Sequence, residues 1–271
     1  MTSALGPRVG PRVISRSVCH PGRVQRARSF GLVAEEYERG RPSYPLAAIS
    51  WLLGDQPLDV VDLGAGTGKL TSALVAAGHR VVAVEPVDEM RAILSQRVPE
   101  ARAVVAATAE STGLPAVSAD AVVAGAAFHW FDRARTFPEI TRILRPRGTL
   151  GLLGNGFADS ASWVRRLQEI LGGPRLGKEG HWPHEQELLG WFDETDERQF
   201  ELDHRVDRNR LLDLAVSRSN VAVLAPEDRQ NLLGQISALW DEEPELRGRE
   251  EVKLAYLTLV RRARHPRRAP G

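Results

Sequence analysis

The feature that most constrains the fold of this 271-residue chain is a short apolar run that ends in an acid and leads into alternate glycines. The run Val60–Leu63 contains Asp62, and the residues that follow it are Gly64, Ala65, Gly66, Thr67 and Gly68. The apolar residues predict a buried strand. The glycines predict a tight turn into a helix, because glycine adopts positive φ readily and lets a ligand approach the backbone. The N–H groups at the start of that helix would face the ligand.

A second acid follows at the spacing expected of a nucleoside site. Residues 80–84 predict another buried strand, which ends at Glu85, 23 residues after Asp62. An acid in that place hydrogen-bonds the hydroxyl groups of a ribose. The two features together predict a nucleoside-bearing cofactor in a doubly wound α/β fold.

The spacing of the glycines distinguishes between kinds of nucleotide-binding turn. A P-loop requires G-x-x-x-x-G-K-[ST], but Leu63 and Leu70 occupy its first and last positions. A dinucleotide fingerprint requires G-x-G-x-x-G/A, whereas the sixth residue counted from Gly64 is Lys69. The remaining pattern is an acid followed by G-x-G-x-G.

This pattern resembles the first motif of the class I S-adenosylmethionine-dependent methyltransferases. Four later segments resemble further motifs of that family in the same order: Glu85–Met90, Thr108–Pro115, Asp120–Ala127 and Leu144–Leu150. The resemblance covers about residues 58–155. It implies a seven-stranded, mostly parallel, Rossmann-like sheet with helical additions over the acceptor site.

The resemblance also implies which residues contact the methyl donor, S-adenosylmethionine, and its product, S-adenosylhomocysteine. We expect Asp62 to hold the glycine loop or to reach the donor's amine, and Glu85 to bind the ribose. Thr108 stands where the family often has an acid, so a backbone contact at Ala109 is the alternative there. The remaining donor contacts expected from the motifs are Gly64, Ala65, Gly66, Gly68, Pro86, Met90, Glu110 and Ala126.

Two flanking segments, Tyr37–Pro45 and Phe128–Asp132, resemble a branch of small-molecule enzymes related to the trans-aconitate methyltransferases. In that branch the first segment is a lid over the cofactor, which makes Tyr37 and Arg41 candidate donor contacts. Arg41 has two functional interpretations: it pairs with a carboxylate of the donor or with one of an acidic acceptor. The structural alternative is an arginine that lies over the following helix.

Candidate acceptor-side residues follow two of the predicted strands, because ligands of open α/β sheets bind beyond the carboxyl ends of the strands. His129 is the candidate catalytic residue, as a base or as a hydrogen-bond donor to the acceptor. The alternative is that its ring packs with Trp130 and Phe131. Trp130 and Asn155 are the candidate acceptor-binding residues, and a turn residue is the alternative for Asn155.

The pattern along the chain predicts one methyltransferase domain at residues 30–264, with its cofactor core at 58–155 and acceptor-side additions at 156–250. Basic tails are expected at 1–29 and 265–271. Asp88 is expected to cap the helix that follows Glu85. The remaining elements are predicted as helices at 45–53, 68–77, 88–98, 133–144, 160–171, 208–217 and 226–240, and as strands at 101–107, 121–127, 149–153, 198–206 and 252–260.

Charge and composition exclude several classes of protein. The net charge of +1 hides acid-free basic segments at 1–29 and 261–271, and charge on tails rather than on a folded face argues against a nucleic-acid partner. No apolar stretch is long enough to span a membrane. The single cysteine, Cys19, suits a reducing cytoplasm. His181 and His184 without a nearby cysteine make a poor metal site, so no metal is expected.

We therefore expect a cytoplasmic enzyme that methylates a small molecule, with its oligomeric state left open. The acceptor is either an acidic metabolite methylated on a carboxylate oxygen or a phenolic or lipid-like compound. A non-catalytic protein that binds the donor and acts through partners is the alternative. A nicotinamide-dependent oxidoreductase is disfavoured by Lys69.

Overall fold

The structure is a computed structural model that describes residues 31, 33–158, 161–172 and 182–267. The expected tail at residues 1–29 and residues 268–271 lie outside the described residues.

One sheet of seven strands organises the molecule, in the order β3-β2-β1-β4-β5-β7-β6. The strands β1 to β5 pair in parallel, and β7 lies antiparallel between β5 and β6. This arrangement confirms the predicted doubly wound, mostly parallel sheet. The strands are β1 (Asp59–Leu63), β2 (Arg80–Val84), β3 (Ala103–Val105), β4 (Ala119–Gly125), β5 (Leu144–Phe157), β6 (Phe192–Val206) and β7 (Val252–Pro266).

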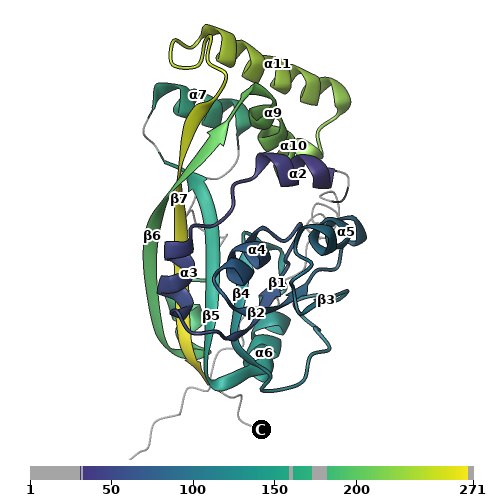
Figure 1. The fold of residues 1–271 in the computed structure, drawn as a ribbon, viewed down its shortest axis with the longest axis vertical. Coiled ribbons are helices and arrows are strands. Elements are labelled where there is room, and N and C mark those ends of the chain that lie inside the picture. Colours follow the sequence, from purple (N-terminus) through teal and green to yellow (C-terminus); the bar gives the residue numbers. More distant parts are fainter. Residues whose placement is uncertain (1–30, 32, 159–160, 173–181, 268–271) are drawn as a thin grey trace, which may run out of the picture.

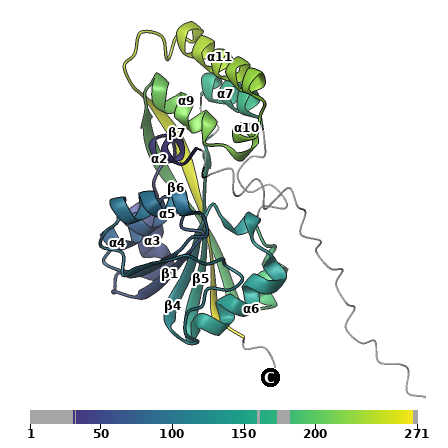
Figure 2. The same cartoon turned by 90° about the vertical axis from the view of Figure 1, so that its right-hand side faces the viewer.

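Helices cover both faces of the parallel part of the sheet (Figure 2). On one face lie α3 (Leu46–Leu53), α4 (Lys69–Ala76) and α5 (Asp88–Arg97), and on the other lies α6 (Arg133–Ile143). Apolar side chains of α3 and α4 pack on β1, β2 and β4, whereas Phe137, Ile140 and Ile143 of α6 fill the opposite face. The short helix α8 (Glu185–Leu189) joins the α6 side through Leu188.

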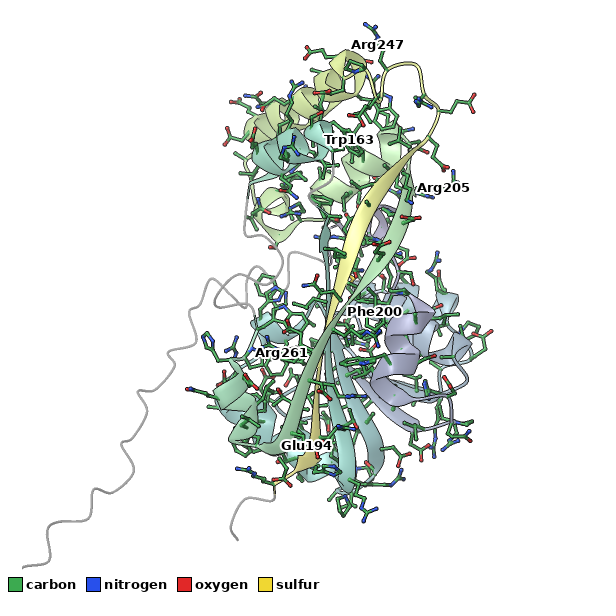
Figure 3. All side chains as sticks on the ribbon, turned by 90° about the vertical axis from the view of Figure 1, so that its left-hand side faces the viewer. Trp163, Glu194, Phe200, Arg205, Arg247 and Arg261 are labelled. Carbon is green, nitrogen blue, oxygen red and sulfur yellow. The ribbon has the colours of Figure 1, made fainter. Side chains whose placement is uncertain are left out.

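A second group of helices lies at the far end of the long strands (Figure 1). It consists of α7 (Ser162–Leu171), α9 (Arg208–Val216), α10 (Ser219–Ala222) and α11 (Pro226–Glu242). Helices α7, α9 and α11 share a core of their own with the ends of β6 and β7, which includes Trp163, Leu167, Leu214 and Trp240. Figure 3 shows how far β6 reaches, with Arg205 beside these upper helices and Glu194 near the opposite end of the sheet.

The helix α2 (Ala34–Gly40) lies between the two groups (Figure 1). A side chain at Gly40 would collide with the backbone of Asp213 and Leu214 in α9, so this glycine allows α2 to pack directly on α9. Arg39 adds an ion pair to Asp213 with a nitrogen–oxygen distance of 2.8 Å. At its other end, Gly31 lies against Val87 and Glu89 at the start of α5. The segment therefore connects the cofactor core with the upper helices.

Two strand boundaries differ from the predictions at the antiparallel edge. β6 begins at Phe192 rather than 198, and β7 continues to Pro266 rather than 260. The charged stretch at 193–197 does not show the alternation of a strand, but its acids face arginines across the ladder: Glu197 pairs with Arg261, Asp196 with Arg262 and Glu194 with Arg264. Because β7 ends at Pro266, the basic tail predicted to start at 265 begins inside the sheet. The arginines at 261, 262 and 264 are neutralised by these acids on a folded face.

Other boundaries are wrong for local reasons. β3 covers only Ala103–Val105, and α5 is preceded by Val87 as N-cap, so Asp88 is its first residue and not its cap. β5 begins at Leu144, because Leu144 pairs with Ala119 before a bulge. Residues 145–148, predicted as a turn, form that bulge opposite Asp120. β5 also continues past its predicted end at 153 to Phe157.

Candidate active site

The glycine loop joins β1 to α4 with three positive φ angles, at Gly64, Gly66 and Gly68. The N–H groups of Gly64 and Ala65 donate to the carbonyl of Val84 at the end of β2, at 2.8 and 3.1 Å. A side chain at Gly64 would lie 2.7 Å from the Cβ of Ala127. The loop is thus fixed between the ends of β2 and β4, as the sequence pattern predicts.

Gly66 forms the open part of the loop. Its φ is +58°, and apart from its chain neighbours no atom of the described residues lies within 4 Å of the position that a Cβ would take. Its N–H donates to Oε2 of Glu85 at 2.9 Å, and the N–H of Val87 donates to Oε1 of the same carboxylate at 2.9 Å. Burial raises the pKa of Glu85. Each carboxylate oxygen keeps a further lone pair for another donor, so the acid is held in place without being saturated.

Asp62 is fully buried at the end of β1 and only half satisfied. Its Oδ2 accepts a hydrogen bond of 2.7 Å from the hydroxyl of Thr71. Its Oδ1 is buried and has no hydrogen-bond partner in the part of the chain that the structure describes. Burial, with a smaller contribution from the charge of Glu85, raises the pKa of Asp62 to about 7. An orphaned buried carboxylate oxygen is costly unless a ligand supplies the missing donor.

A carboxylate of α2 fastens this helix to the glycine loop. Glu38 accepts hydrogen bonds from the hydroxyl of Thr67 at 2.6 Å and from Nζ of Lys69 at 3.0 Å. Nε of Arg97 lies 2.9 Å from the same carboxylate. Burial lowers the pKa of Lys69, whose side chain is only 17% exposed. These three contacts define what we call the Glu38 latch, and they place α2 over the loop.

Two tyrosines accompany the latch. Burial raises the pKa of Tyr37, the charge of Arg41 opposes this rise, and the charges of Glu85, Glu38 and Asp62 add to it. Burial also raises the pKa of Tyr44. A side chain at Gly125, the last residue of β4, would lie 2.7 Å from the Tyr44 hydroxyl. Both phenols therefore lie at the edge of the sheet where the acceptor is expected.

Arg41 extends away from the loop toward the upper helices. Its Nε donates to Oγ of Ser217 at 2.8 Å, and its Nη2 donates to the Ser217 carbonyl at 3.2 Å. Its guanidinium lies 5.4 Å from the centre of the Tyr37 ring. The arginine thus turns toward the end of α9 rather than lying over α3. A contact of Arg41 with a carboxylate of donor or acceptor stays a prediction.

The end of β4 carries the candidate catalytic residue on a strained turn. Ala126 has a φ of +52°, which is unfavourable for a residue with a side chain. The 3₁₀ turn Phe128–Trp130 follows, and it brings the His129 ring to a centroid distance of 4.5 Å from the Trp130 ring. The packing alternative for His129 is thus partly realised. This contact does not test the predicted role in catalysis.

The donor contacts expected in the segments that follow β2 and β3 differ in their exposure. Met90 and Ala109 are buried, whereas Pro86 and Thr108 are exposed. Glu110 accepts the N–H of Asp132 at 2.8 Å, which fixes it at the start of α6. Contacts of these residues with a donor stay predictions.

Asn155 lies within β5 rather than after it, because the strand continues to Phe157. Its Nδ2 donates to the carbonyl of Ser43 at 2.9 Å, and its Oδ1 accepts from the hydroxyl of Thr258 at 2.6 Å. The prediction that Asn155 follows the strand is therefore wrong, as is the alternative of a turn residue. Its amide links the segment before α3 to β5 and β7. Acceptor binding by Asn155 stays a prediction.

Sequence reasoning did not single out Glu38 or Tyr44, although both belong to the segment quoted for the resemblance. The loop carries two side-chain donors two residues apart, the hydroxyl of Thr67 and the ammonium of Lys69, and these could have indicated that an acid such as Glu38 binds there. Their pairing depends on how α2 lies over the loop, which no local pattern reports.

No group of three or more possible metal ligands occurs among the described residues. His184 precedes α8 and is exposed, and His181 lies outside the described residues.

Comparison with known proteins identifies the family. Residues 61–152 match the protein family described as "Methyltransferase domain" (Methyltransf_11). The "Uncharacterized methyltransferase Rv3342" of Mycobacterium tuberculosis is 40% identical over 236 residues, which cover 87% of this chain and 95% of that protein. The chain belongs to the class I S-adenosylmethionine-dependent methyltransferases.

Solved structures of other methyltransferases share the fold. The "Putative Type II Methyltransferase" from Anaeromyxobacter dehalogenans has a TM-score of 0.57 and 23% identity, covering 83% of this chain and 97% of that chain. A phosphoethanolamine N-methyltransferase 2 from Haemonchus contortus, in complex with phosphomonomethylethanolamine and S-adenosylhomocysteine, has a TM-score of 0.51 and 16% identity. It matches 95% of this chain and 62% of its own length. As a methyltransferase, the chain requires a methyl donor, and the family uses S-adenosylmethionine.

Proposed function

We propose that this methyltransferase binds S-adenosylmethionine along the glycine loop and transfers its methyl group to a small-molecule acceptor. The observation that carries the donor assignment is the buried Oδ1 of Asp62, on the strand that leads into the glycine loop, which has no hydrogen-bond partner among the described residues. The donor's ammonium group is the kind of hydrogen-bond donor that this oxygen lacks. Glu85 would hold the ribose with the lone pairs that the N–H groups of Gly66 and Val87 leave open. The residues present therefore fit the donor.

When bound, the donor supplies a methyl group already activated by its sulfonium charge. The protein's task is then to hold the acceptor in line with that methyl group, and positioning is the main catalytic contribution. Tyr37, Tyr44 and His129 lie at the edge of the sheet where this alignment is needed. A carboxylate acceptor requires no base, whereas a phenol or an amine gains from one.

The placement of α2 supports a small acceptor. The Glu38 latch fastens this helix to the loop, and Gly40 packs it on α9. The helix therefore covers the sheet edge between the cofactor core and the upper helices. A covered site suits a molecule that the protein can enclose. No helix among the described residues is both long and apolar enough to cross a membrane. A cytoplasmic location, suggested by Cys19 as the single cysteine, remains part of this proposal.

The first test is a thermal-shift titration of the full chain with S-adenosylhomocysteine, S-adenosylmethionine and NAD in parallel. A ligand at about 100 times its Kd adds roughly 2.7 kcal/mol to the stability, which corresponds to a rise of several degrees for a domain of this size. We expect this rise with the two adenosyl-sulfur compounds and not with NAD. A rise with NAD alone, or none at all, contradicts the donor assignment.

The role of His129 is tested by methyl transfer across pH with a His129→Ala variant. The acceptor is the first compound turned over in a screen of small carboxylic acids, phenols and amines, followed by S-adenosylhomocysteine production. As a base or a hydrogen-bond donor, His129 contributes typically 10²- to 10⁴-fold, so we expect a loss of at least about 10²-fold and an altered pH profile. His184→Ala, which removes an exposed histidine, is the matched control. A rate that His129→Ala leaves unchanged at every pH excludes the role.

A further inference from the structure

Two arginines lie at the ends of α2 and α9, and a tyrosine of β7 belongs to the same buried cluster as Leu211 and Leu214 of α9. Arg41 follows α2, and Arg218 follows α9 immediately after Ser217. Tyr256 lies on β7, packed against the Phe157 ring at a centroid distance of 5.0 Å. Burial lowers the pKa of Arg218, and the charge of Arg41 adds to this; burial raises the pKa of Tyr256, and the charges of both arginines oppose this rise. We call the two arginines and Tyr256 the arginine pair and its tyrosine.

Within the part of the chain that the structure describes, no acid neutralises the arginine pair. Among the described residues, neither Arg41 nor Arg218 forms an ion pair, although most other arginines of the sheet and upper helices do. Burial, with a smaller contribution from the charge of Arg41, lowers the pKa of Arg218 to about 10. Because a guanidinium stays protonated near neutral pH, two positive charges lie close together in a partly desolvated place. Such an arrangement is unfavourable without an anion.

The hydrogen bonds of the pair position the guanidinium groups without neutralising them. Arg41 donates twice to Ser217, an uncharged residue whose own hydroxyl donates to the carbonyl of Leu214 at 2.7 Å. Arg218 donates to the carbonyl of Gly172 at 3.3 Å, and its Nε is buried with no partner in the described part of the chain. Both side chains are held in place with N–H groups still available.

Tyr256 adds a neutral donor to the same place. Its side chain is 5% exposed, and burial raises the pKa of its phenol, so the hydroxyl keeps its proton. Within the described residues, this hydroxyl forms no hydrogen bond. Two guanidinium groups and a phenol make a donor set suited to carboxylate or phosphate oxygens.

We propose that Arg41, Arg218 and Tyr256 form a subsite for an anionic group of the acceptor, a carboxylate or a phosphate. The subsite rests on the proposed function, because it would hold the anionic group of an acceptor whose methylated atom lies in line with the donor. It also specifies the substrate class: an acceptor with a carboxylate or phosphate group. Oxygens held by two guanidinium groups have their lone pairs engaged, so the methylated atom is another atom of the same molecule.

The test measures anion binding to the full chain by calorimetry, with and without S-adenosylhomocysteine, at constant ionic strength set by sodium chloride. Citrate probes for carboxylate recognition, inorganic phosphate for phosphate recognition, and glycerol is the neutral control. The variants are Arg218→Gln and Tyr256→Phe. Arg229→Gln is the matched control, because Arg229 also has a buried, unpartnered Nε and donates only to carbonyls, those of Ala222 and Leu224.

We expect saturable binding of citrate or phosphate that weakens at least tenfold in Arg218→Gln, weakens in Tyr256→Phe and is unchanged in Arg229→Gln. If citrate binds more tightly, the acceptor carries a carboxylate; if phosphate binds more tightly, the acceptor carries a phosphate group. Tyr256→Phe keeps the test valid if Arg218→Gln does not fold. Absence of saturable binding, or equal binding by all variants, overturns the subsite. S-adenosylhomocysteine binding without anion binding contradicts this inference alone, and loss of S-adenosylhomocysteine binding contradicts the proposed function.

Discussion

The two sides of α2 differ in the sign of the charged side chains that lie there without an oppositely charged partner among the described residues. On the side of the glycine loop the buried charges are acids, Asp62 and Glu85, and burial raises the pKa of both. On the side of the upper helices they are arginines, Arg41 and Arg218, and burial lowers the pKa of Arg218. A buried charge without a partner is retained at a cost in stability. The contrast indicates that the first side is prepared for a cation and the second for an anion.

The change at Glu85 has the largest expected effect on the acidic side. Glu85→Ala removes the acceptor of two backbone N–H groups and the expected ribose contact. A hydrogen bond to a charged group contributes roughly 1.5–3 kcal/mol, so we expect S-adenosylhomocysteine affinity, measured by calorimetry, to fall by about ten- to 150-fold. Glu243→Ala removes a comparably buried acid from the upper helices and should leave the affinity unchanged. Equal losses in both variants would show that only general destabilisation is measured.

The change at Asp62 should separate stability from binding. Its pKa is raised from 3.8 to about 7, so the unfolded chain releases this proton at lower pH than the folded chain. The unfolded state therefore binds fewer protons between these values, and wild-type stability falls as pH rises through this window. Asp62→Asn removes that loss, and we expect a higher Tm than wild type at pH 8.

The same variant should bind S-adenosylhomocysteine about tenfold more weakly at pH 8, because an amide does not neutralise an ammonium group; tenfold corresponds to about 1.4 kcal/mol. Asp120→Asn, at the opposite end of the neighbouring strand β4, is the control for both measurements. An affinity equal to wild type in Asp62→Asn would mean that the carboxylate does not face the donor.

The smallest expected effect is on the Glu38 latch, which holds the helix α2 between the two sides. Glu38→Gln weakens the contacts to Thr67, Lys69 and Arg97, and net hydrogen-bond contributions are about 0.5–1.5 kcal/mol. We expect amide hydrogen exchange in α2 to accelerate about two- to tenfold. Glu35→Gln is the matched control on the same helix, since Glu35 is exposed and pairs only with Arg39. Equal acceleration in both variants would contradict the latch.

The two sides also differ in how far the sequence predicts them. The strand, acid and glycines of the loop are consecutive, so the local pattern determines the backbone turn and places Asp62 and Glu85 together. The upper side depends on register and packing between distant segments. The acids at 193–197 become a strand only because β7 presents arginines opposite them. Arg218 meets Arg41 only because Gly40 lets α2 pack on α9.

The long strands also limit how the site can open. β7 is paired with β6 from Pro266 to Val252, without interruption by a loop, and this ribbon runs from the cofactor core into the upper helices (Figure 3). A continuous hydrogen-bonded ribbon resists hinge rotation, because rotation at any point along it would break ladder bonds. The helix α2 has no such ladder and is held by side chains at both ends. If α2 covers the acceptor as proposed, we expect acceptor entry and product exit to require movement of α2, while the two groups of helices keep their spacing.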